Sequence, residues 1–135
     1  MKHLFLLALA ATLTFASCKE KTAEVTEATA DPLYTEVIAM HDEVMPLTAQ
    51  LSDLKGKLTE LKSDDNSRVV LDHIVKLDGA DEAMKSWMAN FKEPENKAEA
   101  QEYLQGEKLK IIEVSIQING ALERGKFLVD SLTVK

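Results

Sequence analysis

The chain contains little that would favour a fold other than helices. Only 3 prolines and 5 glycines occur among its 135 residues. No stretch alternates apolar and polar residues in the manner of a half-buried strand. Cys18 is the one cysteine, so no disulfide bond can form within the chain. These absences favour an all-α fold and exclude a disulfide-bonded one.

The usual signatures of catalysis are also missing. The sequence has no nucleophile elbow, no glycine-rich phosphate loop and no His-Glu-x-x-His motif. The run His41-Asp42-Glu43 does not converge on one metal ion, because consecutive helical residues point about 100° apart. We therefore expect a protein that is not an enzyme.

Basic residues are in the minority. The chain carries 16 lysines and arginines against 23 aspartates and glutamates, for a formal net charge of −7. Nucleic-acid binding depends on neutralising phosphates with basic side chains, and attraction to anionic lipid has the same requirement. The composition therefore argues against a nucleic-acid partner and leaves membrane affinity to a covalent lipid.

The first residues have the three parts of a bacterial export signal. Lys2 gives a positive start, residues 4–15 form an apolar run, and two small residues precede Cys18. The run has about 12 residues, whereas a membrane span needs about 20. We expect residues 1–17 to be removed as a signal peptide. Residues 15–18 resemble a lipobox, which predicts a lipid on Cys18; an ordinary secretory signal with a free thiol is the alternative.

Residues 18–30 join this cysteine to the remainder of the chain. They include no large apolar side chain, and such a segment cannot bury enough surface to offset its ordering entropy. We therefore expect a flexible tether. Lys19 after the cysteine, rather than aspartate, resembles signals that permit transfer to the outer membrane. The predicted location is the cell envelope, with a lipid anchor in the outer membrane, on its periplasmic or surface face.

Residues 31–135 are predicted to form a helical bundle domain. Asp31 and Pro32 are typical of a helix start. Apolar residues then recur at alternating spacings of four and three, which predicts one helix of about 30 residues with a coiled-coil-like seam. We expect Pro46 to bend this helix outward without disturbing its packed face. The seam residues are Leu33, Val37, Met40, Val44, Leu47, Leu51, Leu54, Leu58 and Leu61.

Two more helices are predicted, one from about residue 67 to Pro94 and one from about residue 95 to 134. We expect Gly120 and Gly125 to bend or fray the last helix, whose apolar stripe is wide enough to cover two partners. Short connections make sequential helices antiparallel, which predicts an up-down-up three-helix bundle. The second seam is predicted to be Val70, Ile74, Leu77, Asp81, Met84, Met88 and Phe91. Two alternatives are open for the one acidic residue of this seam. Asp81 pairs with Lys108, or the seam shifts locally to Ala80 and leaves Asp81 exposed.

The predicted pairing of helices brings four methionines, the one tryptophan and a histidine to one level, near the tether. This candidate cluster comprises Met40, His41, Met45, Met84, Trp87, Met88 and Tyr103. Thioether and imidazole ligands are suited to Cu(I), which makes a Cu(I) site one interpretation. The other is ordinary packing, because methionine fills irregular gaps and makes favourable contacts with aromatic rings.

The runs at residues 41–46 (HDEVMP) and 87–91 (WMANF), behind a lipoprotein signal, resemble small uncharacterised Bacteroidota lipoproteins. Some of those proteins carry the label "viral A-type inclusion protein". The resemblance implies a helical envelope protein and assigns no catalytic residue. The leading interpretation is a membrane-anchored, non-catalytic interaction or scaffold module that engages an envelope protein or a second copy of itself. A carrier of Cu(I) or another small ligand is the alternative.

Overall fold

The computed structural model describes residues 31–134. They form four α-helices, α1 (Pro32–Val44), α2 (Leu47–Glu60), α3 (Ser67–Asn90) and α4 (Gln101–Thr133). No strand occurs in this part of the chain, so the predicted all-helical class is confirmed. The predicted signal peptide (residues 1–17), Cys18 and the tether (residues 18–30) lie outside the described residues.

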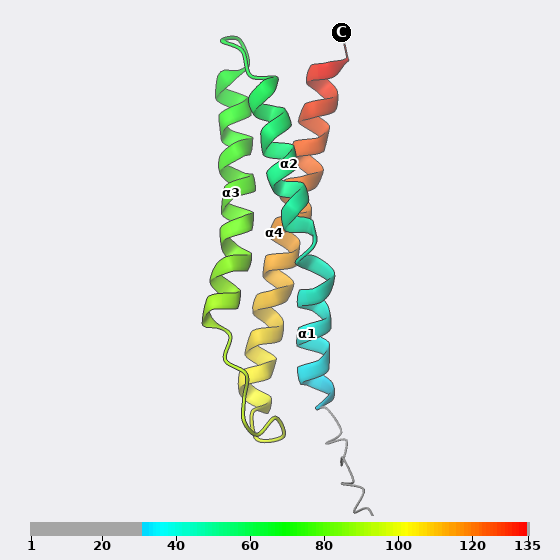
Figure 1. The fold of residues 1–135 in the computed structure, drawn as a ribbon, viewed down its shortest axis with the longest axis vertical. Coiled ribbons are helices and arrows are strands. Elements are labelled where there is room, and N and C mark those ends of the chain that lie inside the picture. Colours follow the sequence, from blue (N-terminus) through cyan, green and yellow to red (C-terminus); the bar gives the residue numbers. More distant parts are fainter. Residues whose placement is uncertain (1–30, 135) are drawn as a thin grey trace, which may run out of the picture.

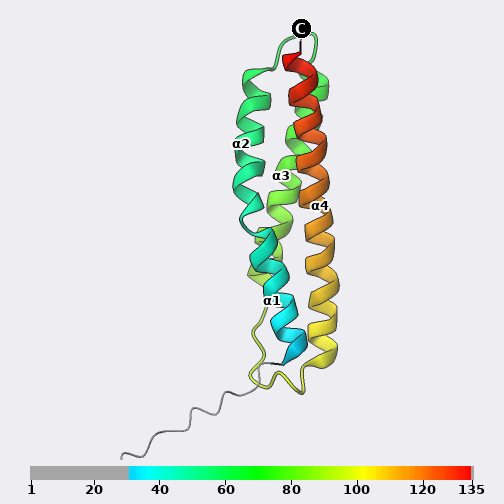
Figure 2. The same cartoon turned by 90° about the vertical axis from the view of Figure 1, so that its right-hand side faces the viewer.

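The four helices make three rods that lie side by side. α1 and α2 follow one another as the first rod, α3 returns beside α2, and α4 runs along the whole length (Figures 1 and 2). The α2–α3 connection lies at one end of the bundle, and the α3–α4 connection lies at the other end together with the start of α1 (Figure 1). α4 packs against all three other helices. The predicted helical bundle is therefore present, and α4 is its central element.

The first rod begins where predicted but is not one helix. The Asp31 carboxylate accepts hydrogen bonds from the backbone N–H groups of Leu33 at 2.9 Å and Tyr34 at 3.2 Å, as expected of an N-cap. The prediction of a single helix was wrong, because the regular helical hydrogen bonding is interrupted at Met45 and Pro46, although both residues keep right-handed helical backbone angles. Proline has no N–H to donate, and its ring clashes with the preceding turn. The apolar faces of α1 and α2 nevertheless point into the same core.

α3 buries a slightly different edge from the one predicted. Its buried residues are Val70, Leu77, Ala80, Met84 and Trp87. The inward placement of Met88 was wrong, since this side chain is 37% exposed. Asp81 pairs along its own helix with Lys85 at 2.6 Å rather than with Lys108, and Ala80 takes the buried position. After Leu77 the buried positions follow at spacings of three, four and three residues. This pattern buries the indole of Trp87 instead of the thioether of Met88.

α4 starts later than predicted. The chain runs through a connection from Phe91 to Ala100 before the helix begins at Gln101. The backbone N–H of Lys92 donates to the hydroxyl of Tyr103 at 2.7 Å, and Gln101 donates to the Asp31 carboxylate at 2.5 Å. These polar contacts tie the connection and the start of α1 to the first turn of α4.

The expectation that Gly120 and Gly125 would bend or fray α4 was wrong. The helix is continuous through both glycines to Thr133. Gly125 is buried, and a Cβ atom there would lie only 2.5 Å from Cδ2 of Leu54 on α2. The missing side chain is therefore a packing feature, because it lets α2 approach α4 closely.

The core extends along the bundle and draws apolar residues from all four helices, from Val37 to Leu128. A chain that begins after Cys18 therefore contains every helix of the described core. Within residues 31–134, none of the helices combines the length and the hydropathy that crossing a bilayer requires.

Candidate functional site

An aromatic stack joins three helices near the end of the bundle where α1 begins. The imidazole of His41 stacks on the indole of Trp87 with ring centroids 5.5 Å apart. Trp87 stacks in turn on Phe91 at 5.0 Å, and Phe91 lies 6.2 Å from Tyr103. The structure thus brings His41, Trp87 and Tyr103 of the predicted cluster into one layer. Trp87 is only 6% exposed, so most of this layer is interior packing.

The four methionines of the predicted cluster occupy different environments. Met84 is fully buried and Met88 is 37% exposed, while Met40 and Met45 are partly buried against the core. Within residues 31–134, no group of three or more His, Cys, Asp or Glu side chains could hold a metal ion. Methionine sulfur is a different class of ligand, so the Cu(I) site stays a prediction.

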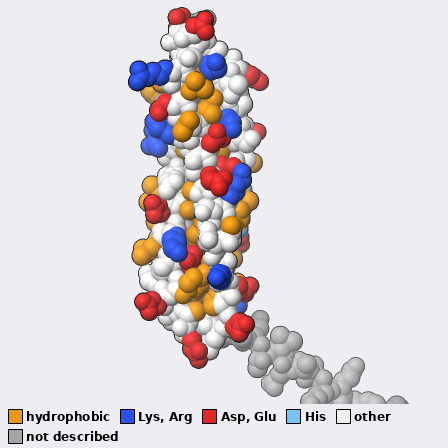
Figure 3. Space-filling view, turned by 90° about the vertical axis from the view of Figure 1, so that its left-hand side faces the viewer, with side chains coloured by type: hydrophobic (Ala, Val, Ile, Leu, Met, Phe, Trp, Pro, Cys, Tyr) orange, Lys and Arg blue, Asp and Glu red, His pale blue; other side chains and the backbone are white. Residues whose placement is uncertain are grey.

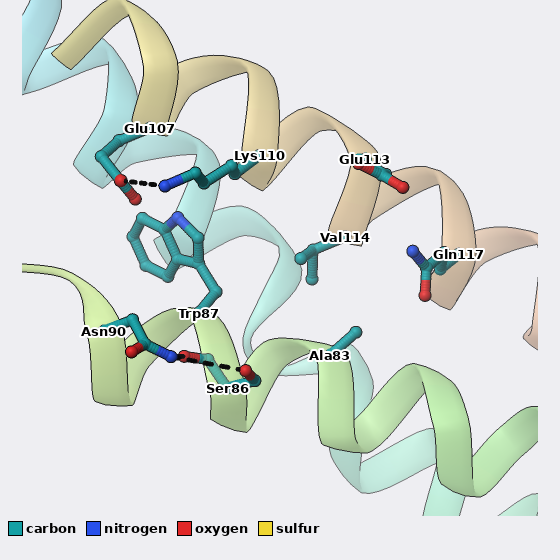
Figure 4. A pocket seen from close by; sticks show the side chains of 9 residues that line it. All are labelled: Ala83, Ser86, Trp87, Asn90, Glu107, Lys110, Glu113, Val114 and Gln117. Carbon is teal, nitrogen blue, oxygen red and sulfur yellow. Dashed lines mark hydrogen bonds and ion pairs between the residues drawn. The ribbon is translucent and has the colours of Figure 1, made fainter. Parts of the chain in front are cut away.

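A polar pocket that the sequence did not indicate lies beside this layer. It opens between α3 and α4 with a volume of about 430 Å³. Glu107, only 3% exposed, accepts a hydrogen bond from the Lys110 amine at 2.7 Å. This hydrogen bond and the negative charge raise the pKa of Lys110. Figure 4 shows both side chains beside the indole of Trp87, whose buried Nε1 has no hydrogen-bond partner in the described part of the chain.

Two pairs of polar residues in the pocket bind each other. Glu107 is paired with Lys110, and the Asn90 amide donates to the Ser86 carbonyl at 2.7 Å (Figure 4). Glu107 lies in the buried face of α4 between Leu104 and Ile111. Its spacing of three and four residues from these neighbours was the available sequence signal. Because Glu107 and Lys110 both belong to α4, their ion pair compensates the buried charge within one helix.

A second polar contact closes the same end of the bundle. The Tyr34 hydroxyl on α1 donates to the Glu93 carboxylate at 2.9 Å, and Lys97 pairs with the same carboxylate at 3.1 Å. The hydrogen bond from Tyr34, followed by the contacts of Lys97, lowers the pKa of Glu93. Burial and the Glu93 contact raise the pKa of Tyr34. The start of α1 is therefore linked to the α3–α4 connection.

The outer face of α4 carries a stripe of exposed apolar side chains. Leu109 is 61% exposed, Ile116 68%, Phe127 74% and Val134 82%. At about 100° per residue, these four positions fall within about 20° of one line along the helix. The buried residues of α4, such as Ile111 and Ile118, point to the opposite side. We call these four residues the outer stripe of α4.

The other exposed apolar residues do not form a comparable feature. On α3 they are Val69, Leu71, Val75 and Met88. Val69 points about 160° away from Leu71, and Met88 lies almost five turns further along the helix. Figure 3 shows the face of the bundle on which α3 lies, where hydrophobic side chains form separate small groups among acidic and basic ones. Single exposed apolar residues are normal on protein surfaces. The outer stripe instead sets four of them close to one line over about seven turns, three on α4 and Val134 directly after its end.

The sequence analysis missed the members of the outer stripe, although it predicted that the last helix could cover two partners. The missed signal was the spacing of seven, eleven and seven residues between the four positions. No protein-family model matches the chain, and no curated protein or solved structure matches it either. The resemblance to Bacteroidota lipoproteins therefore stays a prediction. The fold and the stripe define a class: an all-helical bundle whose longest helix also exposes apolar side chains on the face opposite the core.

Proposed function

We propose that this protein is a lipid-anchored, non-catalytic interaction module of the bacterial cell envelope, and that the outer stripe of α4 is its contact surface. The observation that carries the proposal is the position of the stripe. It lies opposite the core, so it contributes nothing to packing within the bundle, yet it exposes four large apolar side chains. Exposed apolar side chains gathered on one face of a helix are typical of protein interaction sites.

The proposed anchor is the lipid on Cys18. The basic start at Lys2, the short apolar run and the small residues before the single cysteine support it. Several acyl chains on one residue hold a protein to a bilayer far more firmly than one chain. Lys19 after the cysteine supports the outer membrane as the location. In this arrangement the bundle stands outside the cytoplasm and presents α4 to other envelope proteins.

The anchor is tested by feeding cells a clickable palmitate analogue and separating the inner and outer membranes. We expect label on the wild-type protein in the outer-membrane fraction, and none on a Cys18→Ser variant. Unlabelled wild-type protein would contradict the anchor, and label confined to the inner membrane would contradict the location.

The contact surface is tested with a photo-reactive amino acid at position 116 in living cells. Position 75 on α3 is the matched control, because Val75 and Ile116 are both 68% exposed. The proposal predicts covalent products from position 116 that are absent or much weaker from position 75. Equal yields from the two positions would show that α4 has no special role.

A further inference from the structure

We propose that the pocket between α3 and α4 binds a free α-amino acid with an aliphatic side chain. None of the residues that line this pocket belongs to the outer stripe of α4, so ligand binding here is a second function beside contact with a partner protein. Three groups around the pocket favour such a ligand: an indole N–H without an acceptor, a lysine with unused donors, and a glutamate outside any ion pair.

The indole of Trp87 presents the first unused group. The side chain is only 6% exposed, and its buried Nε1 has no hydrogen-bond partner within residues 31–134. Figure 4 shows the nitrogen edge of the ring turned toward Lys110 and Glu107, which line the pocket. A buried donor without an acceptor is unfavourable, and the edge of an aromatic ring is positive. A ligand oxygen with negative charge is therefore favoured at this nitrogen.

Lys110 places a positive charge beside the same nitrogen. Its amine donates to the buried Glu107 carboxylate at 2.7 Å, and an ammonium group has three donors, so donors remain for a ligand. The hydrogen bond to Glu107 and its negative charge raise the pKa of Lys110, which keeps the amine charged. The Lys110 side chain is 64% exposed, so it can turn to admit a ligand while the helix stays in place. A ligand carboxylate then bonds both the ammonium and the indole N–H.

Glu113 supplies the opposite charge at the rim of the pocket. It lies three residues after Lys110 on α4 and belongs to no ion pair within the described residues. The helix rises about 4.5 Å between the two positions, and the Glu113 carboxylate is turned away from the Lys110 amine (Figure 4). A zwitterion bonded at both ends needs protein charges about 8–9 Å apart, with two hydrogen bonds of about 2.8 Å and about 3 Å within the ligand. The ammonium and carboxylate of an α-amino acid fit this arrangement, whereas a simple anion or cation leaves one charge unpaired.

The remainder of the pocket suits an aliphatic side chain. Ala83 on α3 and Val114 on α4 face each other across it (Figure 4). The volume of about 430 Å³ is typical of a site for one small molecule. Among the described residues that line the pocket, Glu107, Lys110 and Glu113 are the charged ones. Because the two ends of the amino acid use these charges, a charged ligand side chain would find no partner.

NMR spectroscopy of the indole N–H tests the site. Trp87 is the one tryptophan of the chain, so its N–H gives one resolved signal in ¹⁵N-labelled residues 19–135, which contain every helix of the described core. The probe is L-leucine at neutral pH. We expect a saturable downfield shift of the indole proton at millimolar leucine, because the nitrogen gains an acceptor. Leucinamide lacks the carboxylate and 4-methylpentanoate lacks the ammonium, so each should bind several-fold more weakly.

A conservative variant tests the cationic half of the ligand. Glu113→Gln keeps the shape of the side chain and removes its charge, so the affinity for leucine should fall about two- to fivefold, the range of an exposed ion pair. Glu123→Gln makes the same change on the same helix but outside the pocket, and should leave the affinity unchanged. Both glutamates are exposed, so both variants should keep the fold, as measured by circular dichroism.

Each outcome decides the proposal. A saturable shift with leucine that is weaker with both analogues and in Glu113→Gln supports it. No shift up to the solubility limit of leucine overturns the site. Equal responses to leucine and the two analogues overturn the assignment to a zwitterion, and equal affinities of the wild type and Glu113→Gln overturn the pairing with Glu113. None of these results bears on the outer stripe, which crosslinking at position 116 tests separately.

Discussion

Two glycines of this chain have opposite roles that only the fold reveals. At Gly125 an added Cβ would lie 2.5 Å from the buried Leu54 side chain, whereas at Gly79 on α3 nothing lies within 4 Å. Alanine favours a helix interior over glycine by about 1 kcal/mol, and overpacking a core costs about 1–3 kcal/mol. The packing effect therefore outweighs the helix preference at Gly125 but not at Gly79.

The prediction is that Gly125→Ala destabilises the bundle by up to about 2 kcal/mol, because the overlap with Leu54 costs more than the helix gains. Gly79→Ala should stabilise it by up to about 1 kcal/mol. Urea unfolding of residues 19–135, followed by circular dichroism, measures both changes. A stabilising Gly125→Ala would mean that α2 and α4 are not in close contact at this position.

The contact between Tyr34 and Glu93 gives a second prediction at this scale. The pKa of Glu93 is lowered from 4.5 in the fold. Its contribution to stability is therefore present above the ordinary pKa and is lost as the pH falls through the lowered pKa. Tyr34→Phe removes the donor that is the largest cause of the shift. We expect the pKa of Glu93 to rise toward its usual value, measured by NMR titration of its carboxyl carbon.

Asp72 is the internal control for that titration. Its pKa is also lowered, chiefly by the hydrogen bond from Lys76, but it lies in the part of α3 far from the α3–α4 connection (Figure 1). The pKa of Asp72 should be unchanged in the Tyr34→Phe variant. If both carboxyl groups shift together, the change reflects a general loss of structure rather than the loss of one hydrogen bond.

At the scale of the elements, the sequence predicted which segments are helical better than it predicted how each helix faces its neighbours. Asp31 fixes the start of α1 because its short carboxylate can reach the free N–H groups of the first turn. The buried face of α3 was harder to predict, because two apolar patterns pass through Leu77 and Met84. One continues through Asp81 and Met88, and the other through Ala80 and Trp87. In the structure the second pattern is buried, so Trp87, which is larger than Met88, lies inside. At Pro46 the sequence predicted a bend but not the interruption of helical hydrogen bonding that separates α1 from α2.

The candidate site was less predictable than the helices. The proximity of His41 to Trp87 follows from how the first rod pairs with α3, and sequence spacing was enough to suggest it. The spacing of Glu107 from Leu104 and Ile111 puts it on the buried face of α4, but a charged residue in such a position is not a signal for burial by itself. The outer stripe of α4 was visible as a spacing, but its exposure depended on which face of α4 the other three helices cover.

The two faces of α4 give a prediction at this scale. Ile118 is fully buried and Ile116 is 68% exposed, although they are two residues apart. Ile118→Ala should lower the free energy of unfolding by about 2–4 kcal/mol through lost burial and a cavity. Ile116→Ala should change it by no more than about 0.5 kcal/mol. Urea unfolding at low protein concentration measures both, and equal losses would contradict the assignment of the two faces.

At the scale of the whole molecule, the bundle uses one long helix for two purposes. The inner face of α4 contacts α1, α2 and α3, and its outer face carries a second apolar line. Because the first is needed for folding and the second is not, changes in the outer stripe should separate contact from stability. The acidic surface and the proposed lipid on Cys18 are consistent with a domain that meets proteins rather than nucleic acids.

The most direct test of the proposed function is the accessibility of a thiol on the outer stripe in living cells. Ile116→Cys and Val75→Cys place thiols at positions that are both 68% exposed in the structure. In dilute purified protein of residues 19–135, both should react with a small maleimide at similar rates. In cells the thiol at position 116 should react several-fold more slowly than that at position 75, because a partner covers α4. Equal rates in cells would contradict the claim that the outer stripe is a contact surface.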